Sequence, residues 1–74
     1  SLAIGANTQA HGITVDGNFT LLSLWASATD ATAMTGQPIP NGADTISYDG
    51  TNIIITVAAA WTRALAVIEY VQQL

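Results

Sequence analysis

The segment ISYDGTNIIITV, residues 46–57, constrains the fold more than any other part of the sequence. Apolar and polar residues alternate along most of it, with the period of two that a half-buried β-strand shows. Asp49-Gly50 lies near its middle, and Asp-Gly is typical of the tight turns that join antiparallel strands. A two-residue and a four-residue loop give the same parity, and only Ile54 interrupts the alternation. The sequence therefore predicts a hairpin whose apolar face carries Ile46, Tyr48, Ile53, Ile55 and Val57.

A second Asp-Gly step occurs earlier in the chain, in the run ITVDGNFTLLSLW at residues 13–25. A three-residue loop at residues 16–18 would set Val15 opposite Phe19. The apolar side chains then share one face and the threonines share the other. We therefore predict another antiparallel hairpin over this segment.

The period of the sequence changes from two to about 3.6 after Val57, which is the period of an amphipathic helix. Residues 57–74 contain no Gly or Pro, and spacing them at about 100° gathers the apolar ones on one half of a helix. That stripe consists of Val57, Ala60, Trp61, Ala64, Leu65, Val67, Ile68, Val71 and Leu74. We predict a C-terminal helix that folds back over the apolar face of the hairpin.

A shorter helix is predicted between the two hairpins, over residues 28–35. Ser27 and Asp30 have the spacing of a helix capping box, although the residue three positions after the Ser is usually Glu or Gln. Gly36 followed by Pro38 is a suitable C-terminal end for the helix. The sequence therefore predicts an α+β fold: a small single domain with two antiparallel β-hairpins, a short central helix and a longer C-terminal amphipathic helix.

Residues 1–12 show no sustained period, so we expect a flexible N-terminal arm followed by a single α+β domain at residues 13–74. A chain of 74 residues has a small core, and the absence of cysteine excludes disulfides as its support. Only 8% of the residues are charged, against roughly 25% in an ordinary soluble domain. So few charges cover a monomer surface poorly, and we expect stability to come from association with other subunits.

The charge balance argues against two classes of partner. The formal net charge is -4, and Arg63 is the only Lys or Arg in the chain. Nucleic-acid binding needs clustered cations, so we expect no nucleic-acid partner. The most apolar stretch, residues 53–68, is interrupted by Thr and Arg and falls short of the ~20 residues of a transmembrane helix, so we expect no membrane span.

No constellation of residues predicts catalysis. His11 is the only histidine and there is no cysteine, so a nucleophile lacks a credible base and a transition metal lacks ligands. We expect no enzymatic activity, no cofactor and no metal site. The one alternative is weak calcium binding by the two Asp-Gly tips through Asp16, Asn18, Asp49 and Asn52. Neither tip has the alternating acidic run and distal Glu of a calcium loop, so we interpret both as turns.

The outer half of the predicted C-terminal helix is small and weakly polar, which would permit close approach of a neighbour. Arg63, Ala66 and Tyr70 lie there, Trp61 lies on the apolar stripe, and His11 lies in the arm. We predict these five as interface residues.

We therefore expect a non-enzymatic structural subunit that assembles with itself or with other subunits, such as a virion or capsid-decoration protein or an extracellular filament protein. The alternative is a small extracellular binding module, a carbohydrate- or calcium-dependent adhesin that uses its hairpin tips. The expected location is the virion or the extracellular space.

Overall fold

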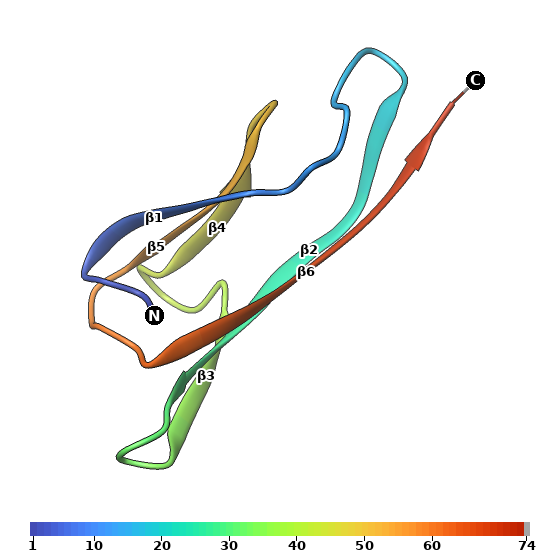
Figure 1. The fold of residues 1–74 in the computed structure, drawn as a ribbon. Coiled ribbons are helices and arrows are strands. Elements are labelled where there is room, and N and C mark those ends of the chain that lie inside the picture. Colours follow the sequence, from blue (N-terminus) through green and yellow to red (C-terminus); the bar gives the residue numbers. More distant parts are fainter. Residues whose placement is uncertain (74) are drawn as a thin grey trace.

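Six β-strands make up the fold, and the predicted α+β class is wrong. The computed structural model describes residues 1–73, and every regular element in that range is a strand. Figure 1 shows them in chain order: β1 Gly5–Ala10, β2 Phe19–Asp30, β3 Thr35–Ile39, β4 Thr45–Tyr48, β5 Asn52–Val57 and β6 Arg63–Gln72.

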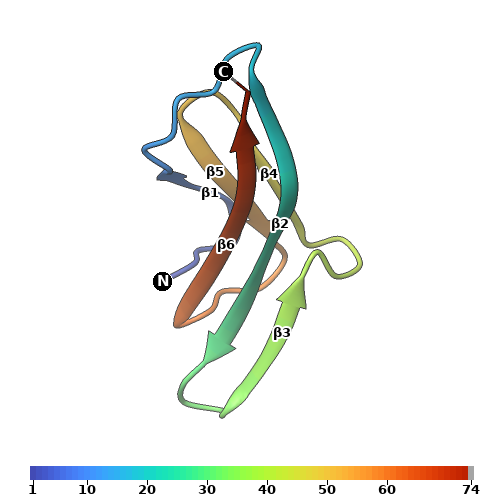
Figure 2. The ribbon, with the colours of Figure 1, turned by 90° about the vertical axis from the view of Figure 1, so that its right-hand side faces the viewer.

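The strands form two three-stranded sheets with antiparallel neighbours throughout. One sheet has the order β1-β5-β4 and the other β3-β2-β6. The connections β1–β2, β3–β4 and β5–β6 each pass from one sheet to the other. The long strands β2 and β6 run side by side in both views (Figures 1 and 2), and they extend the molecule to 46 × 20 × 17 Å.

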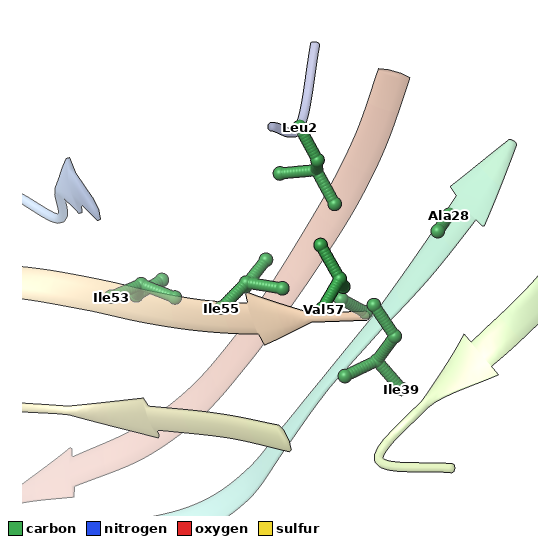
Figure 3. Close-up of a cluster of buried hydrophobic side chains, with 7 residues drawn as sticks. Leu2, Ala28, Ile39, Ile53, Ile55 and Val57 are labelled. Atoms are coloured by element: carbon green, nitrogen blue, oxygen red, sulfur yellow. The ribbon is translucent and has the colours of Figure 1, made fainter. Parts of the chain in front are cut away.

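A small core lies between the two sheets. Ile39 at the end of β3 is its largest fully buried side chain. Figure 3 shows Leu2 from the N-terminal segment and Ile39 from the end of β3 beside Val57 of β5. On the inner face of β2 and β6 two cross-strand pairs are alanine with alanine, Ala26 with Ala66 and Ala28 with Ala64, and the next pair is Leu24 with Ile68. The buried core residues are Leu2, Ala26, Ala28, Ile39, Ile53, Ile55 and Val57.

The predicted hairpin around Asp49-Gly50 is present as β4 and β5. Its register is that of the four-residue loop, with Tyr48 opposite Ile53 and Ile46 opposite Ile55. Buried and less buried residues alternate along β5, which is the outcome expected from its period of two.

The predicted hairpin over residues 13–25 is wrong. Residues 13–15 belong to no strand, and β2 pairs with β3 and β6 instead. Only its turn is present, where the Phe19 amide donates a hydrogen bond to the Asp16 carbonyl, N···O 3.1 Å. Strand β2 has a partner ten residues long in β6, and that ladder offers far more cross-strand contacts than a five-residue local hairpin.

The predicted C-terminal helix over residues 57–74 is also wrong where the structure describes it, because Arg63–Gln72 forms β6. The helical stripe of the sequence arose from apolar residues that stand on both faces of this strand. Val67, Ile68 and Val71 are β-branched and suit a strand. The segment also lacks a good helix N-cap, so local preference for a helix was weak and the ladder with β2 overrides it. Leu74, which the prediction included, lies outside the described residues.

The predicted short helix over residues 28–35 is wrong as well: the chain completes β2, turns at residues 31–34 and begins β3. The carboxylate of Asp30 accepts hydrogen bonds from the amides of Thr32 and Ala33, at 2.9 and 3.0 Å. Asp30 was predicted to cap a helix but stabilises a turn instead. An Asp side chain can do either, because in both cases it accepts hydrogen bonds from backbone amides two or three residues later.

Residues 1–12, which the sequence predicts as a flexible arm, contribute β1 to a sheet and Leu2 to the core. Strand β1 pairs with β5 from Gly5 opposite Val57 to Ala10 opposite Asn52. The flexibility of this segment in solution stays a prediction.

Candidate functional site

The outer face of the β2–β6 pair is unusually apolar for a surface. We define the outer face as Leu22, Trp25, Leu65, Val67 and Val71, together with the polar residues between them. Leu22 is 62% exposed, Leu65 67% and Val71 50%. Trp25 is 44% exposed and lies directly opposite Val67 in the ladder. An apolar patch of this kind marks an interaction surface more often than scattered single residues do.

Over the segment from Trp25 to Ala28, the inward-facing residues of this strand pair are small and the outer face carries larger apolar ones. Alanines point inward, where Ala26 and Ala28 are fully buried, and larger apolar side chains such as Leu65 point outward. The small inner residues let the isoleucines of β5 pack close to the strands. Larger apolar residues such as Leu24 and Ile68 also pack inward, so apolar side chains stand on both faces of the pair.

Strand β6 is an edge strand, so one side of its backbone has no neighbour in the sheet. It is ten residues long, contains no Pro or Gly, and carries only Arg63 and Glu69 as charged residues. Natural edge strands are usually short or protected by Lys, Pro or bulges, because an open edge can pair with another chain. Just before β6, Trp61 exchanges two backbone hydrogen bonds of 3.0 Å with Leu2, and this bridge covers the edge at that point.

An open groove of about 360 Å³ lies between β1 and β6. Asn7, Thr8 and Gln9 line it from β1, and Ala64 and Ala66 line it from β6. The groove shows that β1 does not cover the side of β6 beyond the bridge at Trp61. The free edge of β6 is therefore bordered by open space.

The two Asp-Gly tips use their carboxylates to hold turns. Asp16 accepts a hydrogen bond from the Asn18 amide at 2.8 Å. Asp49 accepts hydrogen bonds from the amides of Asn52 and Thr51, at 2.6 and 2.8 Å. These two backbone bonds, with a smaller contribution from the charge of His11, hold the pKa of the Asp49 carboxyl below its ordinary value of 3.8.

The four candidate calcium ligands come from two different turns, Asp16 and Asn18 before β2 and Asp49 and Asn52 at the β4–β5 tip. Among residues 1–73, no three His, Cys, Asp or Glu side chains lie close enough together to hold a metal ion. In the same range there is no helix long and apolar enough to cross a membrane.

Three of the predicted interface residues lie on β6, but on different faces. Arg63 is exposed on the outer face opposite Thr29, whereas Ala66 is half-buried on the inner face opposite Ala26. Tyr70 is partly exposed and stacks on Phe19 with ring centroids 5.4 Å apart. Phe19 in turn packs against Tyr48 of the other sheet at 5.5 Å, so Tyr70 belongs to an intramolecular aromatic cluster.

The other two predicted interface residues make contacts within the chain. Trp61 is half-buried against the core and its Nε1 has no hydrogen-bond partner in the described residues. His11 contacts the Asp49 carbonyl through Nε2 at 2.9 Å, and its Nδ1 accepts from the Ile13 amide at 3.0 Å. It therefore ties the loop after β1 to the β4–β5 tip.

Sequence reasoning missed the large residues of the outer face. The helix prediction places Leu65 and Val71 on a buried apolar stripe, and the hairpin prediction gives Trp25 no exposed position. Reading residues 63–72 at a period of two would have separated Arg, Leu, Val, Glu and Val from Ala, Ala, Ile, Tyr and Gln. That reading puts apolar residues on both faces, which is the signal of a strand covered on both sides.

Searches against protein-family models, curated proteins and solved structures found no match to this chain.

Proposed function

We propose that this chain is a non-enzymatic structural subunit that associates with copies of itself through the β2–β6 pair, which has an apolar outer face and a free edge along β6. The observation that carries this proposal is the placement of Leu65, Trp25 and Val71 on an exposed sheet face. Burying such side chains is the main favourable contribution to protein association. A virion, a capsid-decoration layer or an extracellular filament is the setting that the low charge and the lack of cysteine favour.

The core supports the same proposal. Among residues 1–73, the only large side chain that is completely buried is Ile39. The exposed surface is 4728 Å², whereas a compact monomer of this mass exposes about 4,300 Å². An elongated chain with so little interior gains stability when a second copy covers its apolar face.

The alternative function, a calcium- or carbohydrate-dependent adhesin, has less support. One oxygen of each tip carboxylate, in Asp16 and in Asp49, already accepts backbone hydrogen bonds. A chelator should leave the melting temperature unchanged if the tips serve as turns.

Size-exclusion chromatography with light scattering over a wide concentration range tests the proposal. We expect a concentration-dependent oligomer and a melting temperature that rises with concentration. Leu65→Thr should weaken self-association about tenfold or more, because the change is repeated in every subunit of a symmetric contact. The matched control is Ile4→Thr, which makes a similar change at an exposed apolar residue outside the outer face. A chain that stays monomeric at millimolar concentration would rule the proposal out.

A further inference from the structure

Resting on the proposed function, we infer that two copies pair antiparallel along the free edge of β6, with a two-fold axis at Ala66. The pairing joins the two β3-β2-β6 sheets into one continuous sheet across the dimer. The partner is a second copy of this chain. Three features of β6 select it: the length of its free edge, the facing of its side chains, and its two opposite charges.

The free edge of β6 begins at residue 62, because Leu2 already bonds to the backbone of Trp61. An axis at Ala66 sets residue 62 of one copy opposite residue 70 of the other. The ladder therefore fills the free edge from its first residue without displacing the Leu2 bridge. The groove beside Ala64 and Ala66 leaves this side of the strand accessible.

The facing of the side chains limits the possible axes. Residues directly opposite each other in an antiparallel pair point to the same side of the sheet. An axis through a residue pairs odd positions with odd positions, so the outer faces of both copies lie on the same side. An axis between two residues would set odd positions opposite even positions, which point to opposite faces, so it does not form a regular ladder. Only residue-centred axes join the apolar outer faces.

The charges then choose among the residue-centred axes. Arg63 is the only Lys or Arg of the chain, and Glu69 follows on the same face of the same strand. They are separated by roughly 20 Å of extended chain, so they cannot pair within one copy. With the axis at Ala66, Arg63 of each copy lies opposite Glu69 of the other. Opposite charges placed across a strand pair stabilise it.

Neighbouring axes lose this complementarity. An axis at Leu65 sets Glu69 opposite Trp61, where Leu2 already occupies the edge. An axis at Val67 sets Arg63 opposite Val71 and Glu69 opposite Leu65. With the axis at Ala66, Leu65 of each copy lies opposite Val67 of the other copy. The two outer faces then form one apolar strip with the charge pairs at its ends.

A charge swap tests the register in the full chain. Arg63→Glu and Glu69→Arg should each weaken dimerisation about tenfold or more, because every attractive pair becomes a repulsive one. The double variant Arg63→Glu/Glu69→Arg should restore the dimerisation constant to within about threefold of the parent, because both pairs are re-formed in reverse. Sedimentation equilibrium measures all four proteins, and circular dichroism checks that each is folded.

A single cysteine gives a readout that does not depend on charge, since the chain has none of its own. Residue 66 lies opposite its own copy, where Cα atoms are about 4.5–5.5 Å apart, within the usual range of about 4.4–6.8 Å for a disulfide. Ala66→Cys should therefore form a covalent dimer on mild oxidation. In the control Val71→Cys, the two cysteines are roughly 34 Å apart in this register, so it should cross-link poorly.

The outcomes separate the register from the proposed function. The β6 pairing would be overturned if the charge variants dimerise as tightly as the parent and Ala66→Cys cross-links no better than Val71→Cys. Self-association itself would then still stand. A chain that is monomeric throughout would overturn both.

Discussion

At the scale of single residues, Asp44 has the most demanding environment in the chain. It is the only buried charged or polar residue among those described, and its carboxylate accepts hydrogen bonds from the Ala58 amide at 3.0 Å and from the side chain of Gln37. These contacts hold the β3–β4 loop against the end of β5. Asp44→Ala leaves the Ala58 amide without its partner, and we expect a loss of about 1–3 kcal/mol in the free energy of unfolding.

Urea denaturation measures this loss. Asp44→Asn keeps an oxygen for the Ala58 amide and should cost less than Asp44→Ala. Equal stability of Asp44→Ala and the parent chain would show that the loop is held by other contacts.

The residue Asp49 should make stability depend on pH in the acid range. Its folded-state pKa is depressed below 3.8 by hydrogen bonds from the Asn52 and Thr51 amides. The stabilisation is therefore complete above the unfolded-state pKa and is lost as pH falls through the folded-state pKa. Asp49→Asn keeps a hydrogen-bond acceptor but does not titrate. Relative to that variant, the parent chain should lose stability as the pH falls below the ordinary carboxyl pKa of 3.8.

Chemical denaturation at a series of pH values measures the difference between the two proteins. Taking the difference removes the contribution of the other carboxyl groups, because distant sites act independently. A difference that does not change with pH would contradict the assignment of the shift to these backbone hydrogen bonds.

At the scale of elements, the approach of β3 to β2 depends on the absence of a side chain at Gly36. A Cβ there would lie 2.9 Å from the Ala28 carbonyl oxygen, which is backbone and cannot move aside alone. We expect Gly36→Ala to cost about 1–3 kcal/mol of stability through this overpacking. Gly17→Ala is the matched control, because nothing lies within 4 Å of its added Cβ. Thermal unfolding compares the two, and equal melting temperatures would contradict this role of Gly36.

The same scale shows where sequence reasoning succeeded and where it failed. The β4–β5 hairpin was predictable because its turn, its period of two and its partner strand lie within twelve residues of sequence. Strand β6 was not predictable in this way, because its partner β2 lies about forty residues earlier and local periodicity carries no record of a distant partner. Alanines and β-branched residues together gave β6 a period that fits a helix or a strand covered on both faces.

At the scale of the whole molecule, one small core holds two sheets together. Ile39→Ala should cost about 2–5 kcal/mol, whereas Ile39→Val should cost about 0.5–1.5 kcal/mol. A chain of this length has roughly 4–11 kcal/mol of total stability, so the alanine variant should lie close to unfolding. Because both sheets share the core, we expect tryptophan fluorescence and far-ultraviolet circular dichroism to report one coincident transition. Separate transitions would show that the sheets unfold independently.

The sequence by itself determined the two Asp-Gly turns, the β4–β5 hairpin with its buried isoleucines, and the shortage of charge that makes association an expectation. Each of these depends on neighbouring residues or on composition, so it can be read locally. Only the tertiary structure decided that residues 63–72 form a strand, that residues 5–10 join a sheet, and which apolar side chains face outward. These outcomes depend on which distant segments pair, and the free energy of pairing comes from contacts that exist only after the chain has folded.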